Sequence, residues 1–273
     1  MEYALFYAEG DDAVPYVPEE DRIGEWVDDL TRRGVSEYGE RLRPEQDATT
    51  VRVRGGEVLV VDGPFSESKE AIGGFDVIDA RDLDEAIEIA SKHPAATFAR
   101  VEIRPFVQWP GADPASRVVP DGFAERPAAG RRYLMLVVAE QGGGSESGSD
   151  DDPEAWVDEM DGRGVRLFGE VLRPPADATF VRRRHGEVLV TDGGFAEAKE
   201  WVAGFDLVEV RDLSEAIEVA AKHPMARGGA IELRPLWPFD VHDDHVARAE
   251  RESAERGVRL EPAATEALAG APL

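Results

Sequence analysis

Apolar and polar residues alternate along several short stretches of this chain, and two longer stretches carry apolar residues at helical spacing. The helical spacing predicts one helix over residues 18–33, stopped by Gly34, and a second that begins at the cap Asp82 and ends at Lys92, just before Pro94. The alternating stretches predict strands over 3–8, 35–42, 49–54, 57–62, 72–80 and 101–106. The order β-α-β-hairpin-β-α-β is typical of a ferredoxin-like α+β unit with an inserted hairpin.

The whole pattern returns 130 residues later in the chain. Asp62-Gly63 recurs as Asp192-Gly193, and roughly half of the aligned positions are identical. We therefore predict two tandem domains of equal size. They span residues 1–106 and 133–236, with a Pro/Gly linker at 107–132 and a partly disordered acidic tail at 237–273.

The strands also indicate how the two copies pack. Tyr3, Leu5 and Tyr7 belong to a first strand that is apolar on both faces, whereas Val101 and Glu102 alternate in the last strand. Helices can cover only one face of such a sheet, so the other face needs a second cover. We expect the covalent twin to supply it, giving an intramolecular pseudo-dimeric α/β barrel with a partly polar space between two facing sheets.

Composition and net charge exclude several classes of site and partner. The formal charge is −26 and the chain has no cysteine, which excludes disulfides, cysteine nucleophiles and Cys-zinc sites. An acidic chain repels phosphate backbones, so we expect no direct nucleic-acid partner. We see no membrane span and no signal peptide, and we expect a cytoplasmic protein that is a monomer or weak dimer.

Four ordered motifs resemble those of the YCII-related (DGPF-domain) family: residues 62–70 (DGPFSESKE), 73–75 (GGF), 82–86 (DLDEA) and 101–105 (VEIRP). The resemblance covers both copies. It implies a dimeric α/β-barrel fold built from ferredoxin-like units. Members of this kind are often discussed alongside extracytoplasmic-function sigma factors, which implies a sigma factor or another regulatory protein as a partner.

The repeat also singles out charged residues that could bind a small anionic ligand. Lysine is rare in the chain, and all four lysines are paired between the copies. A lysine beside carboxylates can hold an anion, although a surface ion pair is the alternative interpretation. The candidate ligand-binding residues are Lys69, Glu67 and Arg104, with Lys199, Glu197 and Arg234 in the second copy.

Acid–base chemistry has its own candidates, Asp62, His93, Asp192 and His223. Each has a structural alternative, because an aspartate before glycine stabilises turns and a histidine in a last helical turn suits the helix dipole. The paired arginines Arg52, Arg54, Arg182 and Arg184 could clamp an anion, but we favour solvated edge arginines. His242 and His245 make only a weak metal motif, so we predict no metal and no cofactor.

Two functions from different classes remain open. We favour a small-ligand-binding or regulatory protein, because no catalytic motif accompanies the duplicated scaffold. The alternative is a small-molecule enzyme of the barrel type, with acid–base residues in the cleft between the repeats. A third interpretation makes the duplication a self-contained pair that docks on another protein.

Overall fold

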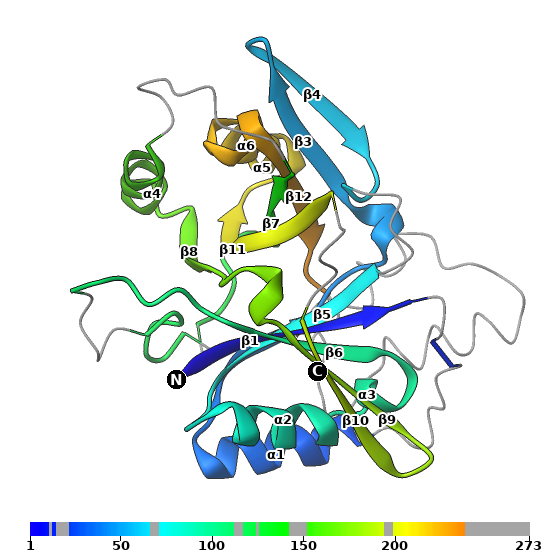
Figure 1. Ribbon diagram of the computed structural model, residues 1–273. Coiled ribbons are helices and arrows are strands. Elements are labelled where there is room, and N and C mark those ends of the chain that lie inside the picture. Colours follow the sequence, from blue (N-terminus) through cyan, green and yellow to red (C-terminus); the bar gives the residue numbers. More distant parts are fainter. Residues whose placement is uncertain are drawn as a thin grey trace, which may run out of the picture.

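Two six-stranded antiparallel sheets face each other in this computed structural model, and helices cover their outer faces (Figure 1). The structure describes residues 1–10, 13–14, 22–65, 71–111, 117–123, 126–141, 152–193 and 199–237. Within these residues, no helix is long and apolar enough to cross a membrane.

The two copies repeat the same elements. The first contains β1 (Glu2–Glu9), α1 (Ile23–Arg33), β2 (Ser36–Arg41), β3 (Thr49–Arg54), β4 (Glu57–Asp62), β5 (Ala71–Asp79), α2 (Leu83–Lys92), α3 (Ala95–Phe98) and β6 (Arg100–Pro105). The second contains β7 (Arg131–Glu140), α4 (Pro153–Gly162), β8 (Arg166–Val171), β9 (Thr179–Arg184), β10 (Glu187–Asp192), β11 (Glu200–Val210), α5 (Leu213–Lys222), α6 (Met225–Gly228) and β12 (Gly229–Pro235). The α+β class and the order of strands and long helices match the expectation. The sequence analysis missed the four-residue helices α3 and α6.

The two copies exchange their hairpins. Sheet one has the order β10-β9-β6-β1-β5-β2, and sheet two has the order β4-β3-β12-β7-β11-β8. Each sheet therefore takes four strands from one copy and a hairpin from the other. The exchanged strands pair in register, with Val101 opposite Val181 in sheet one and Ile231 opposite Val51 in sheet two. A sequence repeat is thus not a closed structural unit.

Arginines fix each exchanged hairpin to the copy that receives it. Arg54 Nη1 donates to Ala226 O at 2.8 Å and Arg54 Nη2 to Gly229 O at 2.9 Å, at the carboxyl end of α6. Arg184 Nη1 donates in the same way to Thr97 O at 2.7 Å, in α3. These guanidiniums satisfy carbonyls that a helix end leaves without partners. The expectation of solvated edge arginines is wrong for Arg54 and Arg184, because the hairpin exchange brings them to the other copy.

An apolar cluster fills the space between the sheets. Phe6 and Phe75 of sheet one meet Phe205 of sheet two, with ring centroids 6.4 and 5.8 Å apart. The linker also contributes, because Phe123 is buried and packs edge-on against Phe168, 4.9 Å away. The part of the linker that the structure describes is therefore not a simple spacer. Isolated bridges join the sheets at Leu42–Leu236 and Phe106–Leu172.

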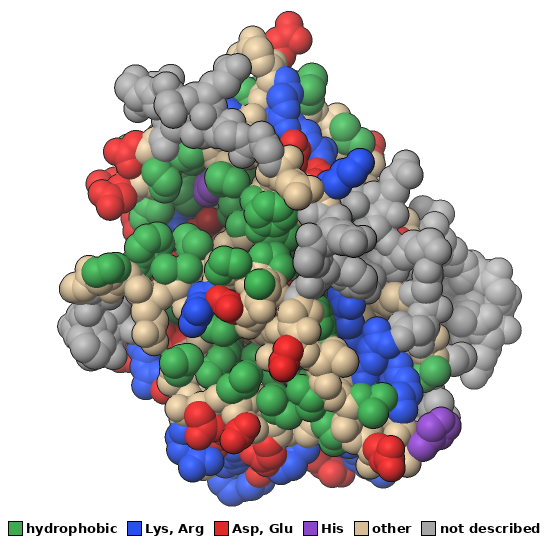
Figure 2. Space-filling model, viewed as in Figure 1, with side chains coloured by type: hydrophobic (Ala, Val, Ile, Leu, Met, Phe, Trp, Pro, Cys, Tyr) green, Lys and Arg blue, Asp and Glu red, His purple; other side chains and the backbone are tan. Residues whose placement is uncertain are grey.

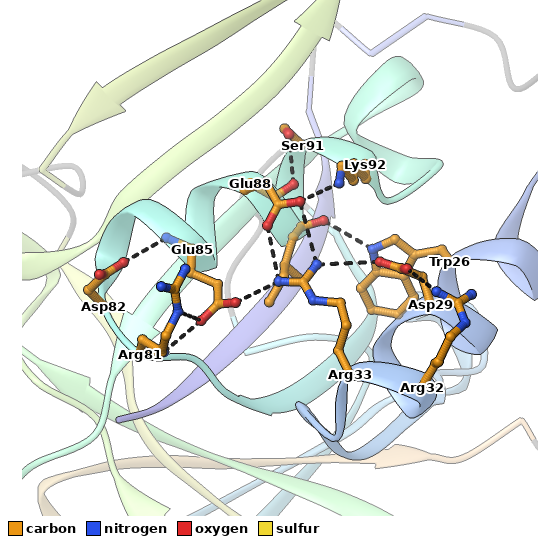
Figure 3. Close-up of polar contacts among 11 residues, drawn as sticks. Trp26, Asp29, Arg32, Arg33, Arg81, Asp82, Glu85, Glu88, Ser91 and Lys92 are labelled. Atoms are coloured by element: carbon orange, nitrogen blue, oxygen red, sulfur yellow. Dashed lines mark hydrogen bonds and ion pairs between the residues drawn. The ribbon is translucent and has the colours of Figure 1, made fainter.

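A second set of contacts holds α1 against α2 over the outer face of sheet one (Figure 3). Trp26 Nε1 donates to Ile89 O at 3.0 Å, and Arg33 Nη2 donates to Glu85 Oε1 at 2.7 Å. Glu88 accepts from Arg33 and pairs with Lys92. These bonds fix the indole of Trp26 beneath α2, next to the buried end of that helix.

The outer strands of the exchanged hairpins are exposed along their whole length. Val61 in β4 is 56% exposed and Val188 in β10 is 47% exposed. Basic side chains lie beside apolar ones on both hairpins (Figure 2). β4 is one of the two edge strands of sheet two, and β10 is one of the two edge strands of sheet one.

We predict that Arg54→Ala lowers the free energy of unfolding by about 1–2 kcal/mol, because four acceptors of the second copy lose a charged donor. Urea unfolding followed by tryptophan fluorescence measures the change. Arg211→Ala is the control, because Arg211 is 80% exposed and, within the described residues, its side chain forms an ion pair only with Glu215, so its loss should cost less than about 0.5 kcal/mol. Equal effects of the two variants would contradict the bracing role of Arg54.

Candidate functional site

The two arginines proposed as ligand-binding residues are buried between the sheets. Arg104 Nη1 donates to Glu102 Oε1 at 3.0 Å, and its Nη2 donates to backbone carbonyls of the second copy, Val202 O among them at 3.2 Å. Arg234 pairs with Glu232 at 3.2 Å and donates to Arg43 O of the first copy at 2.7 Å. Both residues are 2% exposed and tie the copies together. Their placement favours a structural role.

Of the remaining ligand candidates, the structure describes one. Lys199 is exposed, and its carbonyl accepts from Gln141 N at 2.7 Å. The candidates Lys69, Glu67 and Glu197 lie outside the described residues.

The aspartates and histidines proposed for catalysis do not come together within a copy. Asp62 and Asp192 are exposed at the ends of β4 and β10, and the hairpin exchange carries each of them to the opposite sheet. His93 and His223 are 8% exposed beneath the helices of their own sheet. Each histidine therefore sits away from the aspartate that precedes it in its own repeat.

Burial and a hydrogen bond to Nδ1 keep both histidine rings neutral. His93 Nδ1 accepts from Ala95 N at 3.0 Å, and His223 Nδ1 accepts from Met225 N at 3.1 Å. Burial lowers the pKa of each to about 3. The bond to Nδ1 leaves the proton on Nε2. In the first copy, the ring of Tyr7 stacks on His93 with centroids 3.9 Å apart.

A carboxyl group that the sequence analysis overlooked lies next to this stack. Tyr7 Oη donates to Asp76 Oδ2 at 2.5 Å. Asp76 belongs to β5 and stands opposite Gly39 of β2. A Cβ at position 39 would lie 1.8 Å from Asp76 Oδ1, so only glycine lets the carboxyl group rest on the neighbouring strand. Asp76, Tyr7 and His93 form what we call the first-copy site.

The surroundings of the first-copy site bring the pKa of Asp76 close to neutral pH. Burial raises the pKa of Asp76 to about 7, against the opposing effect of the Tyr7 hydrogen bond. The nearby Glu40 adds to the increase, and burial raises the pKa of Glu40 itself to about 7. Burial and Asp76 together raise the pKa of Tyr7 well above its usual value. Among the described residues, no lysine or arginine forms an ion pair with Asp76.

In the second copy, the corresponding carboxylate has an ion-pair partner. Asp206 corresponds to Asp76, and Arg166 Nε donates to its Oδ1 at 2.6 Å. Val137 replaces the tyrosine, and His223 Nε2 lies 4.0 Å from Asp206 Oδ2. The paired Arg166 opposes the rise that burial imposes on the pKa of Asp206. An internal cation therefore neutralises the carboxylate of the second copy.

The first-copy site contains a carboxyl group whose pKa is raised by burial to about 7, and groups with perturbed pKa values are candidates for ligand binding or proton transfer. The signal for it in the sequence is weak. Asp76 and Asp206 interrupt otherwise apolar strands at matching positions, and the differences at 7/137 and 36/166 distinguish the copies. Among the described residues, no group of histidine, aspartate and glutamate side chains is arranged to hold a metal ion.

Comparisons with known proteins give a family and two individual similarities. The sequence model of the YCII-related domain matches residues 1–110 and again residues 133–240. An uncharacterised protein of Rhizobium meliloti (strain 1021) is 41% identical over 78 residues, which are 28% of this chain and 63% of the relative. The crystal structure of a putative chlorite dismutase is 11% identical, with a TM-score of 0.37, over 89% of this chain and 96% of its own.

We predict opposite effects of the matched variants Asp76→Asn and Asp206→Asn on stability. The folded protein holds the Asp76 proton more tightly than the unfolded chain, so this stabilisation is complete below about pH 4 and lost as the pH rises through 7. The free energy of unfolding of Asp76→Asn, relative to that of the native chain, should therefore rise as the pH is raised from 5 to 8. Asp206→Asn should be less stable than the native chain at pH 5 and at pH 8, since it leaves the Arg166 guanidinium without its carboxylate.

Urea unfolding at pH 5 and pH 8 measures both differences. The comparison has to be made between variants, because the two neutral histidines act in the opposite direction as the pH falls below about 6.5. Glu40→Gln separates the contribution of the second raised carboxyl group. A constant difference between Asp76→Asn and the native chain across this range would contradict the assigned protonation.

Proposed function

This chain belongs to the YCII-related domain family with two tandem copies of the domain, and we propose that it is a small-ligand-binding protein with one working site. That site is Asp76 with Tyr7 and His93 in the first copy. The second copy serves as its structural partner, because Arg166 closes the equivalent position. The observation that supports this proposal most is the Asp76 carboxyl group, whose pKa is raised by burial and which forms no ion pair with a cation of the described residues.

The arrangement also supports an enzyme at the same residues, as the second candidate function. A carboxyl group with a pKa of about 7 can serve as a general acid or base at neutral pH. We place such chemistry under the helices of the first copy rather than in a cleft between the repeats. The apolar cluster around Phe205 and the pairs Arg104–Glu102 and Arg234–Glu232 occupy that space.

We further propose that the fused copies reproduce a dimeric α/β barrel within one chain. The shared apolar cluster, the exchanged hairpins and the two isolated bridges between the sheets support this view. A chain that completes its own pair has no need of a second molecule for this purpose. The expected state in solution is therefore a monomer or weak dimer.

A regulatory partner is compatible with the exposed edges of the hairpins. Apolar strand edges such as β4 and β10 can pair with another protein. Light scattering of the chain alone should give the monomer mass of 29.8 kDa. If a purified extracytoplasmic-function sigma factor is the partner, the mixture should form a complex that Leu59→Glu and Leu189→Glu together abolish.

The proposed site predicts ligand binding that depends on the first copy. A thermal-shift screen of small cationic, neutral and anionic compounds at pH 8 should give shifts that Asp76→Asn abolishes. Asp206→Asn is the matched control and should retain them, each measured against the variant's own melting temperature. If no compound of any class gives a shift that depends on Asp76, the proposed site is wrong.

A further inference from the structure

The second copy contains a guanidinium bound in the counterpart of the proposed site. Arg166 Nε donates to Asp206 Oδ1 at 2.6 Å, and Arg166 Nη2 donates to Gly169 O at 2.7 Å. Asp161 of α4 lies 3.6 Å from Nη1. A carboxylate and a backbone carbonyl of neighbouring strands therefore hold this cation, with a second carboxylate nearby.

The first copy keeps the two main acceptors and lacks the cation. Asp76 and Gly39 correspond to Asp206 and Gly169, while Ser36 stands at the position of Arg166. The registers agree, since Ser36 is opposite Ile78 in β5 just as Arg166 is opposite the matching residue of β11. The acceptors of the first copy are therefore preformed, because the repeat has kept the strand geometry that binds the guanidinium.

Residue exposure differs between the copies in the direction expected from the missing guanidinium. Asp206 is 6% exposed and Gly169 is half-buried, whereas Asp76 is half-buried and Gly39 is exposed. Tyr7 binds only one oxygen of the Asp76 carboxyl group. Tyr7 donates to Oδ2 of Asp76, and the oxygen that rests on Gly39 is Oδ1, which matches the oxygen that Arg166 binds in the second copy.

The first-copy counterparts of the Arg166 partners are both acceptors. The Asp76 carboxylate and the Gly39 carbonyl favour a positively charged donor and repel an anion. A planar cation that bonds the carboxylate and the carbonyl together would reproduce both contacts of Arg166. A neutral ligand would leave the carboxylate charge without a partner.

We propose that the ligand of the first-copy site carries a guanidinium or primary ammonium group, which binds Asp76 and the Gly39 carbonyl as Arg166 binds their counterparts. This inference rests on the proposed function and specifies the chemical class of the ligand. Ser36 makes the site available, and an arginine at the same position closes it.

The test uses the full chain and ethylguanidinium chloride, which is the end of an arginine side chain. Two-dimensional amide NMR at pH 8 and constant ionic strength should show saturable shifts around Ser36, Gly39 and Asp76, with a Kd of about 1–10 mM. Propylammonium chloride is the second probe, and sodium propionate is the anionic control. Binding should weaken roughly tenfold at pH 6, because protonation of Asp76 competes with the cation.

Matched variants give each copy the residue that the other copy has at this position. Ser36→Arg should abolish the shifts in the first copy, since its own guanidinium then fills the site. Arg166→Ser should create a second set of saturable shifts around Gly169 and Asp206. Asp76→Asn should lose the first set without losing the folded spectrum.

The possible results separate this inference from the proposed function. Saturable binding of a cation that Ser36→Arg removes would support the assignment. Retained cation binding in a folded Ser36→Arg variant would overturn it, as would binding of propionate at the same amides. If neutral or anionic compounds of the thermal-shift screen bind through Asp76 while neither cation does, the site stands and the assigned ligand class is wrong.

Discussion

The central strand of each copy is buried on both faces, and the rest of the architecture depends on this constraint. In β1, Leu5 faces the helices and Phe6 faces the other sheet, and neither is more than 1% exposed. Separating the copies would expose the aromatic cluster around Phe205 to water, at a cost of about 25 cal/mol for each Å² of apolar surface. Helices alone cannot cover such a sheet, so the fold requires two facing sheets, and the covalent twin supplies the second.

The fusion of the copies removes the symmetry that a pair of separate chains would impose. In a homodimer every substitution appears twice, so a change that closes one site closes the other. Within one chain, the position of Tyr7 in the first copy can carry Val137 in the second, and the position of Ser36 can carry Arg166. The exchanged hairpins stay nearly equivalent, because Arg54 and Arg184 both bind the helix end of the other copy. The scaffold has thus kept its symmetry where the two halves hold each other, while the first-copy site has diverged from its counterpart.

The local pattern of apolar and polar residues was enough to predict the helices and strands. It failed for features that depend on residues far away in the sequence. The strands 49–54 and 57–62 have the expected bounds, because alternation and the Gly55-Gly56 turn are local signals. The sheet that the hairpin joins is not a local property, since Val51 presents the same alternating pattern to either sheet. This is why the contacts of Arg54 were not foreseen. Asp76 was overlooked for a similar reason: its importance comes from Gly39 and Tyr7, which lie on two other strands.

The comparison of the two aspartates supports the proposal that the uncompensated carboxyl group of the first copy serves a function. A buried carboxyl group without a cation destabilises the fold above its pKa, and this chain shows that one arginine on the edge strand relieves that cost. Position 36 lies on the same kind of edge strand and could carry that arginine, yet it carries serine. Local rules are broken in folded proteins mainly where function requires it, and ligand sites often cost stability. In our proposal, the pair Arg166–Asp206 therefore represents the state that the first-copy site reaches when its ligand is bound.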